Sequence, residues 1–170
     1  MLFSTSGCGD STSSGGTGGT SGTGPVETPD NVAGDYLVSL TSGENTCKSM
    51  ADTWVEGAMT EGVQFSITQK GVQIEAETMG ASAIYVLVLT GANDFTGEIH
   101  DSHFVLTNHG TKMYSYLTCD YTINAVVEGD LDGDSIVGTL TYKPVITDNP
   151  DCGDYDCAAE QAFTGTRPSG

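Results

Sequence analysis

The chain has 170 residues, and its five lysines and arginines stand against 23 aspartates and glutamates, which gives a formal net charge of −18. A surface this acidic repels nucleic-acid backbones and anionic lipid headgroups, so nucleic-acid binding is excluded as a function. Solubility, or adaptation to a salty medium that screens self-repulsion, explains the charge; attraction of a cation or a basic partner is the alternative. The length allows one domain with a single core.

The N-terminal segment has an unusual composition. Every residue between Gly9 and Gly24 except Asp10 is Gly, Ser or Thr. Such a segment has no apolar surface to bury, so we expect residues 9–31 to be a disordered linker with a reach of about 30 Å. The folded domain is expected to span residues 32–168.

A cysteine stands directly before this linker. Cys8 follows Gly7, and a Gly-Cys step at the start of a polar tether resembles the lipid-attachment site of bacterial lipoproteins. The resemblance implies that Cys8 carries a lipid and that residues 1–8 are the remnant of a signal peptide. It also implies a place in the cell envelope, at the outer membrane or cell surface, with the lipid anchor as the only membrane contact. Because only seven residues precede Cys8, we expect the start codon to lie upstream of Met1.

Beyond the linker, the hydrophobic pattern has a period of two. Short alternating apolar runs recur at intervals of about ten residues with Gly, Asn or Asp between them, which is typical of antiparallel hairpins. These runs predict strands around residues 36–40, 63–67, 72–76, 95–99, 104–106, 121–127, 136–142 and 163–165.

Two segments depart from this pattern. Residues 83–89 are continuously apolar, and we expect them to form a strand buried on both faces. In residues 48–59, Met50, Trp54 and Ala58 recur at helical spacing and predict a short helix. Its expected role is an apolar plug over one end of the core, and the alternative is that Trp54 stacks on a ligand.

Glycine recurs in the middle of predicted strands, at Gly97, Gly138 and Gly165. A glycine inside a strand marks a sharp bend, a bulge or close backbone packing, and such bends let a sheet curl on itself. We therefore predict an all-β fold, a single closed, up-and-down antiparallel β-barrel of eight or nine short strands with one short helix. A β-sandwich is the second choice.

One predicted hairpin carries a family resemblance. Between residues 123 and 142, Glu128-Gly129 leads into the turn and Ile136-Val137-Gly138-Thr139 leads out of it, and this arrangement resembles the hairpins of secreted lipocalin-like barrels. The resemblance implies non-catalytic binding of a small apolar molecule in the barrel mouth. This requires a hollow interior of at least about 300 Å³. The expected ligand-binding side chains are Phe65, Phe95, Phe104, Ile123 and Trp54.

Four cysteines remain in the domain once Cys8 is set aside. An even set indicates two disulfides and an oxidising compartment. Of the three pairings that are open, we predict Cys152–Cys157, which closes a short loop, together with Cys47–Cys119. A four-thiolate zinc site is the alternative, and it is disfavoured because neither Cys47 nor Cys119 has a second cysteine close by.

An acidic turn is a candidate metal site. Asp130, Asp132 and Asp134 alternate along the chain and offer the hard oxygen ligands that Ca²⁺ prefers, but the similarity to an EF-hand loop ends at Ser135 and Thr141. We expect a solvated Asp/Gly turn, with a weak Ca²⁺ site as the alternative and no other cofactor. Histidines gather at His100, His103 and His109; they are expected to be surface residues, with a transition-metal site as the alternative.

Motifs of catalysis are missing from the sequence. It has no Gly-x-Ser-x-Gly elbow, no His-Glu-x-x-His and no phosphate-binding glycine loop after a strand. We expect a monomeric, non-catalytic protein that binds a small apolar ligand or an envelope protein. The alternative is a structural or adhesive surface module acting through its acidic loops, with Ca²⁺. A hydrolase is the third hypothesis and would need a cleft where histidines and carboxylates converge.

Overall fold

Nine strands and one helix make up the described part of the chain. The structure is a computed structural model, and it describes residues 28–47, 54–116, 119–146 and 157–168. The elements are β1 (Gly34–Asn45), β2 (Met59–Lys70), β3 (Gln73–Met79), α1 (Gly80–Thr90), β4 (Asp94–His100), β5 (His103–Asn108), β6 (Tyr114–Tyr116), β7 (Cys119–Asp132), β8 (Ser135–Ile146) and β9 (Ala159–Thr166).

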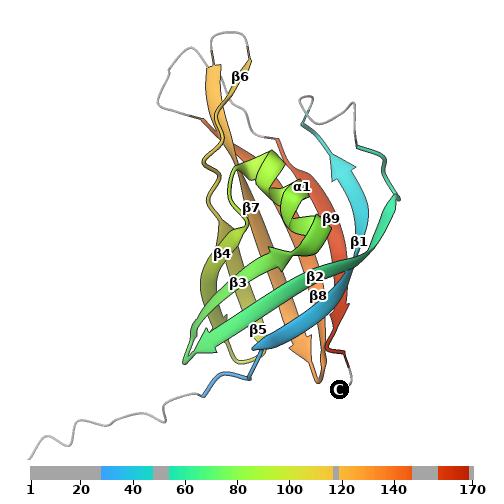
Figure 1. Ribbon diagram of the computed structural model, residues 1–170, viewed down its shortest axis with the longest axis vertical. Helices are drawn as coiled ribbons and strands as arrows, with labels where there is room; N and C mark the ends of the chain where they lie inside the picture. The colour runs from blue at the N-terminus through green and yellow to red at the C-terminus, as the bar shows by residue number, and fades with distance from the viewer. Residues whose placement is uncertain (1–27, 48–53, 117–118, 147–156, 169–170) are drawn as a thin grey trace, which may run out of the picture.

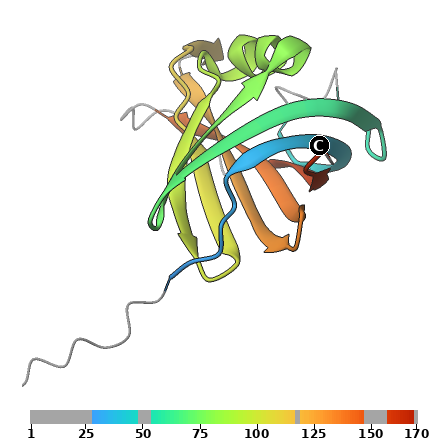
Figure 2. The same ribbon diagram turned by 60° about the horizontal axis from the view of Figure 1, so that its bottom comes forward.

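The strands close into a barrel. Every pairing is antiparallel, β5 pairs with β7, and the first and last strands, β1 and β9, pair with each other. Eight strands therefore form a closed up-and-down barrel, and β6 is an extra strand paired with the start of β7. Figures 1 and 2 show the sheet curled on itself, with α1 at one end. The predicted fold class is confirmed, and the closed barrel is consistent with the lipocalin-like architecture that the resemblance implied.

Alternation along the strands decides which side chains face the interior. On β7 the buried residues are Tyr121, Ile123, Ala125 and Val127, and the residues between them are more exposed. The same period-2 pattern recurs on β3 and β9. Successive side chains of a strand point to opposite faces, so the apolar set of each strand enters the barrel. Val32, which precedes β1, is fully buried as well.

The mid-strand glycines mark places where two backbones approach closely. A β-carbon at Gly138 would lie 2.6 Å from the Cα of Gly129 on β7 and 2.8 Å from the ring of Phe163. At Gly97 it would lie 2.8 Å from the carbonyl carbon of Val105. Real β-carbons do not make contacts this short, so only glycine fits at these two positions. This is the close packing that the sequence pattern predicted.

The segment 83–89, expected to be a strand, forms most of α1 instead. Gly80 (φ 65°) and Gly91 (φ 87°) bracket the helix in left-handed conformations that favour glycine, and the Gly91 N–H donates to the carbonyl of Leu87. A short apolar run fits a strand or a helix equally well by periodicity, which is why the prediction was wrong. The helix buries Val86 and Thr90, while Ile84 is 64% exposed.

The last turn of α1 is held by the segment that leads into β6. Lys112 Nζ donates to the carbonyl of Val88 (2.6 Å), and the Tyr114 hydroxyl donates to that of Leu89 (2.7 Å). The backbone N–H groups of Thr111 and Lys112 both donate to the carbonyl of Thr90. The final carbonyls of a helix have no partner within it, so these contacts fix the helix at the barrel end.

The helix predicted over residues 48–59 is not found in its described part. Residues 54–58 form a turn whose Gly57 N–H donates to the carbonyl of Ser42 (2.7 Å), and Met59 begins β2. Residues 48–53 lie outside the described residues, as do Cys8 and linker residues 9–27. Within the described ranges, no helix combines the length and the apolarity that crossing a bilayer requires.

The predicted disulfide pairing was wrong. Cys47 is bonded to Cys157, 110 residues further along the chain, and Cys119 is disulfide-bonded as well. Cys47 follows β1 and Cys157 precedes β9, so the bond continues the ladder in which these strands close the barrel. Proximity across this junction outweighed the low entropy cost of the short loop that favoured Cys152–Cys157. Cys152 lies outside the described residues.

Candidate functional site

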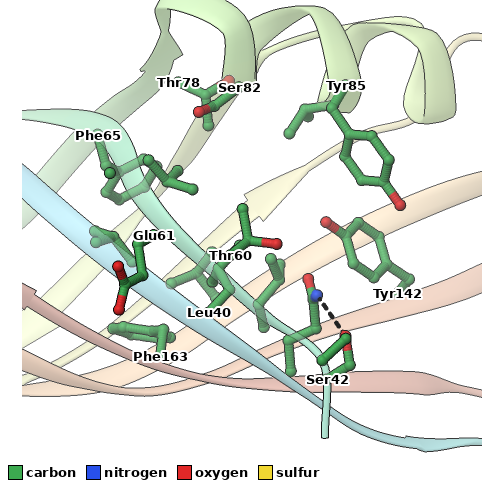
Figure 3. Close-up of a pocket in the computed structure, with 18 of the residues that line it drawn as sticks. Leu40, Ser42, Thr60, Glu61, Phe65, Thr78, Ser82, Tyr85, Tyr142 and Phe163 are labelled. Carbon is green, nitrogen blue, oxygen red and sulfur yellow. Dashed lines mark hydrogen bonds between the residues drawn. The ribbon is translucent and has the colours of Figure 1, made fainter. Parts of the chain in front are cut away.

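The barrel contains a cavity of about 500 Å³ that opens beside α1. The inward faces of β1, β2 and β9 contribute to its wall, together with those of β7 and β8 and one side of α1 (Figure 3). The lining residues are Val38, Leu40, Ser42, Trp54, Val55, Ala58, Thr60, Glu61, Gly62, Val63, Phe65, Thr78, Ala81, Ser82, Tyr85, Val86, Phe95, Val127, Ile136, Leu140, Tyr142, Gln161 and Phe163.

The deep part of the cavity is apolar. Phe65 and Phe95 meet edge to face with their ring centroids 5.7 Å apart, and both side chains are buried. Val127, Ile136 and Phe163 are buried lining residues on β7, β8 and β9. Other core side chains fill the rest of the barrel; they include Ile67, Ile74, Ile99, Phe104 and Leu106. The hollow therefore occupies only part of the interior.

An irregularity in β2 shapes the mouth. Val38 pairs with Val63 but Leu40 pairs with Thr60, so β2 holds one extra residue there, and Gly62 adopts φ 74°. This is a β-bulge, which bends a strand and interrupts its pairing. β3 pairs with β2 only from Gln64 onward, so residues 59–63 have no neighbour on that side in the sheet. The exposed rim residues Glu61, Gly62, Ala81 and Tyr85 lie around this gap.

Two tyrosines bring hydroxyl groups into the cavity. The side chains of Tyr85, from α1, and Tyr142, from β8, extend toward one another in Figure 3. Tyr142 is 2% exposed, and no hydrogen bond of its hydroxyl is found in the described part of the chain. Burial raises the pKa of this phenol well above its usual value, and the nearby Tyr85 adds to the shift. Tyr142 is therefore a neutral hydrogen-bond donor at physiological pH.

Further polar groups lie on other walls. Gln161 Nε2 donates to Ser42 Oγ (3.2 Å), and this bond is dashed in Figure 3. Thr78 is 6% exposed, and its Oγ1 has no hydrogen-bond partner among the residues that the structure describes. Ser82 of α1 lines the cavity as well, and Figure 3 labels both residues. Burying a hydroxyl without a hydrogen-bond partner costs free energy, so a ligand that bonds to Thr78 Oγ1 would recover part of that cost.

Trp54 contributes both packing and a hydrogen bond. Its indole Nε1 donates to the carbonyl of Gly43 (2.9 Å), and its ring meets Tyr142 edge to face with centroids 6.5 Å apart. The hydrogen bond satisfies the polar end of the indole, which leaves the ring as part of the cavity wall.

Three of the five expected ligand-binding residues line the cavity, and two do not. Phe65, Phe95 and Trp54 are lining residues. Phe104 is fully buried and packs toward Phe163 with ring centroids 6.5 Å apart, so it fills the core. Ile123 is buried near the start of β7, before the segment Ala125–Asp130 that pairs with β5. It belongs to the hydrophobic core and is not part of the cavity lining.

Several lining residues were missed by sequence reasoning. Tyr85 lies in the segment that was expected to be a strand. Thr78 follows the inward-facing Ile74 and Ala76 at the same period, and Gln161 occupies an inward position of β9. A polar residue at an inward register of an otherwise apolar strand is the signal that could have found both Thr78 and Gln161.

Two of the three aspartates at the acidic turn form contacts with basic side chains. Asp130 Oδ1 lies 3.0 Å from His103 Nδ1, and Asp134 Oδ1 lies 3.3 Å from Arg167 Nη1. Asp132 is exposed at the end of β7. His100 lies opposite His103 across a tight hairpin and contacts Glu98 instead. Among the residues that the structure describes, no group of three or more His, Cys, Asp or Glu side chains could hold a metal ion. The weak Ca²⁺ site at this turn therefore remains a prediction from the sequence.

Comparison of the chain with family models, with curated proteins and with solved structures finds no match.

Proposed function

We propose that the protein binds a small apolar ligand inside its barrel, without catalysis, while tethered outside the cytoplasm by a lipid on Cys8. The observation that carries the ligand-binding part is the cavity of about 500 Å³ with mostly apolar walls. Ligand pockets of proteins commonly measure about 300–1,000 Å³ and combine apolar walls with a few polar groups. A barrel packed throughout its interior would have argued against this function.

The tethered location rests on separate features. The Cys47–Cys157 disulfide is consistent with an oxidising compartment, where such bonds persist. Cys8 precedes a linker of Gly, Ser and Thr that would hold an acidic domain clear of the membrane. Labelling of the expressed protein with a radioactive fatty acid, compared with a Cys8→Ser variant, tests the anchor. Equal labelling of both proteins would show that the lipid is not attached to Cys8.

A neutral fluorophore tests the cavity. N-phenyl-1-naphthylamine brightens in apolar surroundings, so binding in the cavity should give saturable fluorescence. The Ala81→Trp substitution places a bulky side chain on the mouth and should weaken binding at least about tenfold, the change expected when a well-packed site is obstructed. Ile84→Trp on the exposed face of α1 is the matched control and should bind as the native protein does.

Two results of the fluorescence experiment would contradict the proposal in different ways. No saturable fluorescence in the native protein would overturn ligand binding in the barrel. Equal weakening by Ala81→Trp and Ile84→Trp would place the probe on the outer surface of α1. Both positions are exposed, so neither substitution should prevent folding, and near-ultraviolet circular dichroism verifies this.

A further inference from the structure

The part of the cavity lining that the structure describes includes no cationic side chain. Among its lining residues in the described ranges, Glu61 is the only charged side chain, and it stands at the mouth. The domain beyond residue 30 holds 20 acids and all five bases, which gives a net charge of −15. An anionic ligand entering here would lose its hydration without gaining a charged partner, and it would pass the Glu61 carboxylate. The lining therefore disfavours a carboxylate or phosphate headgroup.

Two residues of the lining that are themselves buried, Thr78 and Tyr142, have hydroxyl groups that can bind a ligand. Within the described part of the chain, Thr78 Oγ1 is buried without a hydrogen-bond partner, and the Tyr142 hydroxyl forms no hydrogen bond. They come from different elements, β3 and β8, so they face the cavity from different walls. A neutral hydroxyl can donate to and accept from a ligand oxygen. Both groups would be satisfied by an uncharged polar group and need no ion.

Resting on the proposed function, we propose that the cavity selects uncharged amphiphiles, molecules with an apolar body and a single hydroxyl, ester or amide group, over the corresponding fatty acid anions. The polar group of the ligand accepts from Tyr142 or exchanges a hydrogen bond with Thr78. The apolar body lies against Phe65, Phe95 and Val127. Selectivity arises because the described lining offers hydroxyls that can bind a neutral oxygen and no cationic side chain to neutralise a carboxylate.

A matched pair of ligands tests this selectivity. Dodecan-1-ol and dodecanoate share a twelve-carbon skeleton and differ in headgroup charge at neutral pH. Dodecan-1-ol is titrated below its solubility limit and dodecanoate below its micelle concentration, each against the full chain, with displacement of N-phenyl-1-naphthylamine as the readout. The alcohol should bind at least about tenfold more tightly than the anion, since an unpaired charge is costly to bury.

Isosteric variants test the two hydroxyls. Thr78→Val and Tyr142→Phe remove a hydroxyl while keeping the shape, and each should weaken dodecan-1-ol binding about three- to tenfold, the usual range for one hydrogen bond. Thr78→Ser keeps the hydroxyl and should bind the alcohol more tightly than Thr78→Val does. Thr96→Val, at an exposed position of β4, is the control for the Thr-to-Val change and should have no effect.

The results distinguish this inference from the function on which it rests. If the fluorophore does not bind, the proposed function fails and the inference fails with it. If the fluorophore binds but dodecanoate displaces it as well as dodecan-1-ol does, ligand binding stands and the selectivity is overturned. If both isosteric variants fold and bind the alcohol unchanged, the assignment of Thr78 and Tyr142 is overturned.

Discussion

Arg167 Nε donates a 2.9 Å hydrogen bond to the hydroxyl of Tyr36, a residue 131 positions earlier in the chain. The guanidinium also lies over the Tyr36 ring, 5.3 Å from its centroid. Its other nitrogens reach the carbonyl of Asn31 (2.6 Å) and the carboxylate of Asp134 (3.3 Å). The Tyr36 hydroxyl in turn donates to the carbonyl of Val32. One side chain thus joins both ends of the domain and the β7–β8 turn, at the barrel end opposite α1.

The Arg167 contacts predict a measurable loss of stability when the charge is removed. Arg167→Met keeps much of the side-chain length but leaves the Tyr36 hydroxyl and the Asn31 carbonyl without this partner. We expect the free energy of unfolding to fall by about 1–3 kcal/mol, the usual cost of such a loss. Chemical denaturation with urea measures it. Lys70→Met, in the exposed β2–β3 turn, should change stability by less than about 0.5 kcal/mol. Equal urea midpoints for the two variants would contradict a stabilising role of the Arg167 contacts.

The disulfide at the closure of the barrel should contribute more than any single side chain. Cys47→Ser combined with Cys157→Ser removes a cross-link between residues 110 positions apart. By the chain-entropy model this lowers the free energy of unfolding by about 3–5 kcal/mol, less where other cross-links already restrict the unfolded chain. Urea unfolding of the double variant without reductant checks the value. A double variant as stable as the native protein would show that the β1–β9 ladder holds the junction unaided.

How far the sequence predicts the fold depends on what each signal encodes. The alternation at Tyr121–Val127 encodes which face is inward, so strands and barrel class could be predicted. Segment 83–89 could not, because an apolar run of this length does not distinguish a helix from a strand. The Cys47–Cys157 pairing depends on β1 meeting β9, and local spacing contains no information about that contact. Phe104 and Phe65 are both inward-facing, and only the packing decides which of them borders the cavity.

A third stability prediction concerns Gly138. A β-carbon there would collide with the backbone of β7 at Glu128 and Gly129, neither of which can move without disturbing the ladder. We expect Gly138→Ala to lower the free energy of unfolding by about 1–3 kcal/mol, the usual cost of overpacking. Val137→Ala changes the neighbouring, half-exposed position and serves as the control, with a smaller expected effect. Thermal unfolding of both variants compares them, and a native-like Gly138→Ala would show that the two strands can separate there.

The buried tyrosines predict a loss of stability at alkaline pH. Burial raises the pKa of Tyr142, and it raises that of Tyr36 despite the opposing effect of Arg167. In the unfolded chain these phenols ionise near pH 10, so above that pH the unfolded state binds fewer protons than the folded state does. Their contribution to stability is therefore complete below about pH 10 and is lost as the pH rises toward the folded-state values. Urea unfolding at about pH 8 and pH 11 should show this fall.

Tyr142→Phe isolates the larger shift, because phenylalanine does not titrate. The variant should lose less stability than the native protein between these two pH values, so the difference in unfolding free energy between the two proteins should move in favour of the variant as the pH rises. This comparison cancels the lysines, which titrate in the same range in both proteins. A difference that stays constant between pH 8 and pH 11 would mean that Tyr142 ionises equally easily in the folded and unfolded states. The cavity around its hydroxyl would then be as well hydrated as solvent, which would also remove the basis for its role as a neutral donor to a bound ligand.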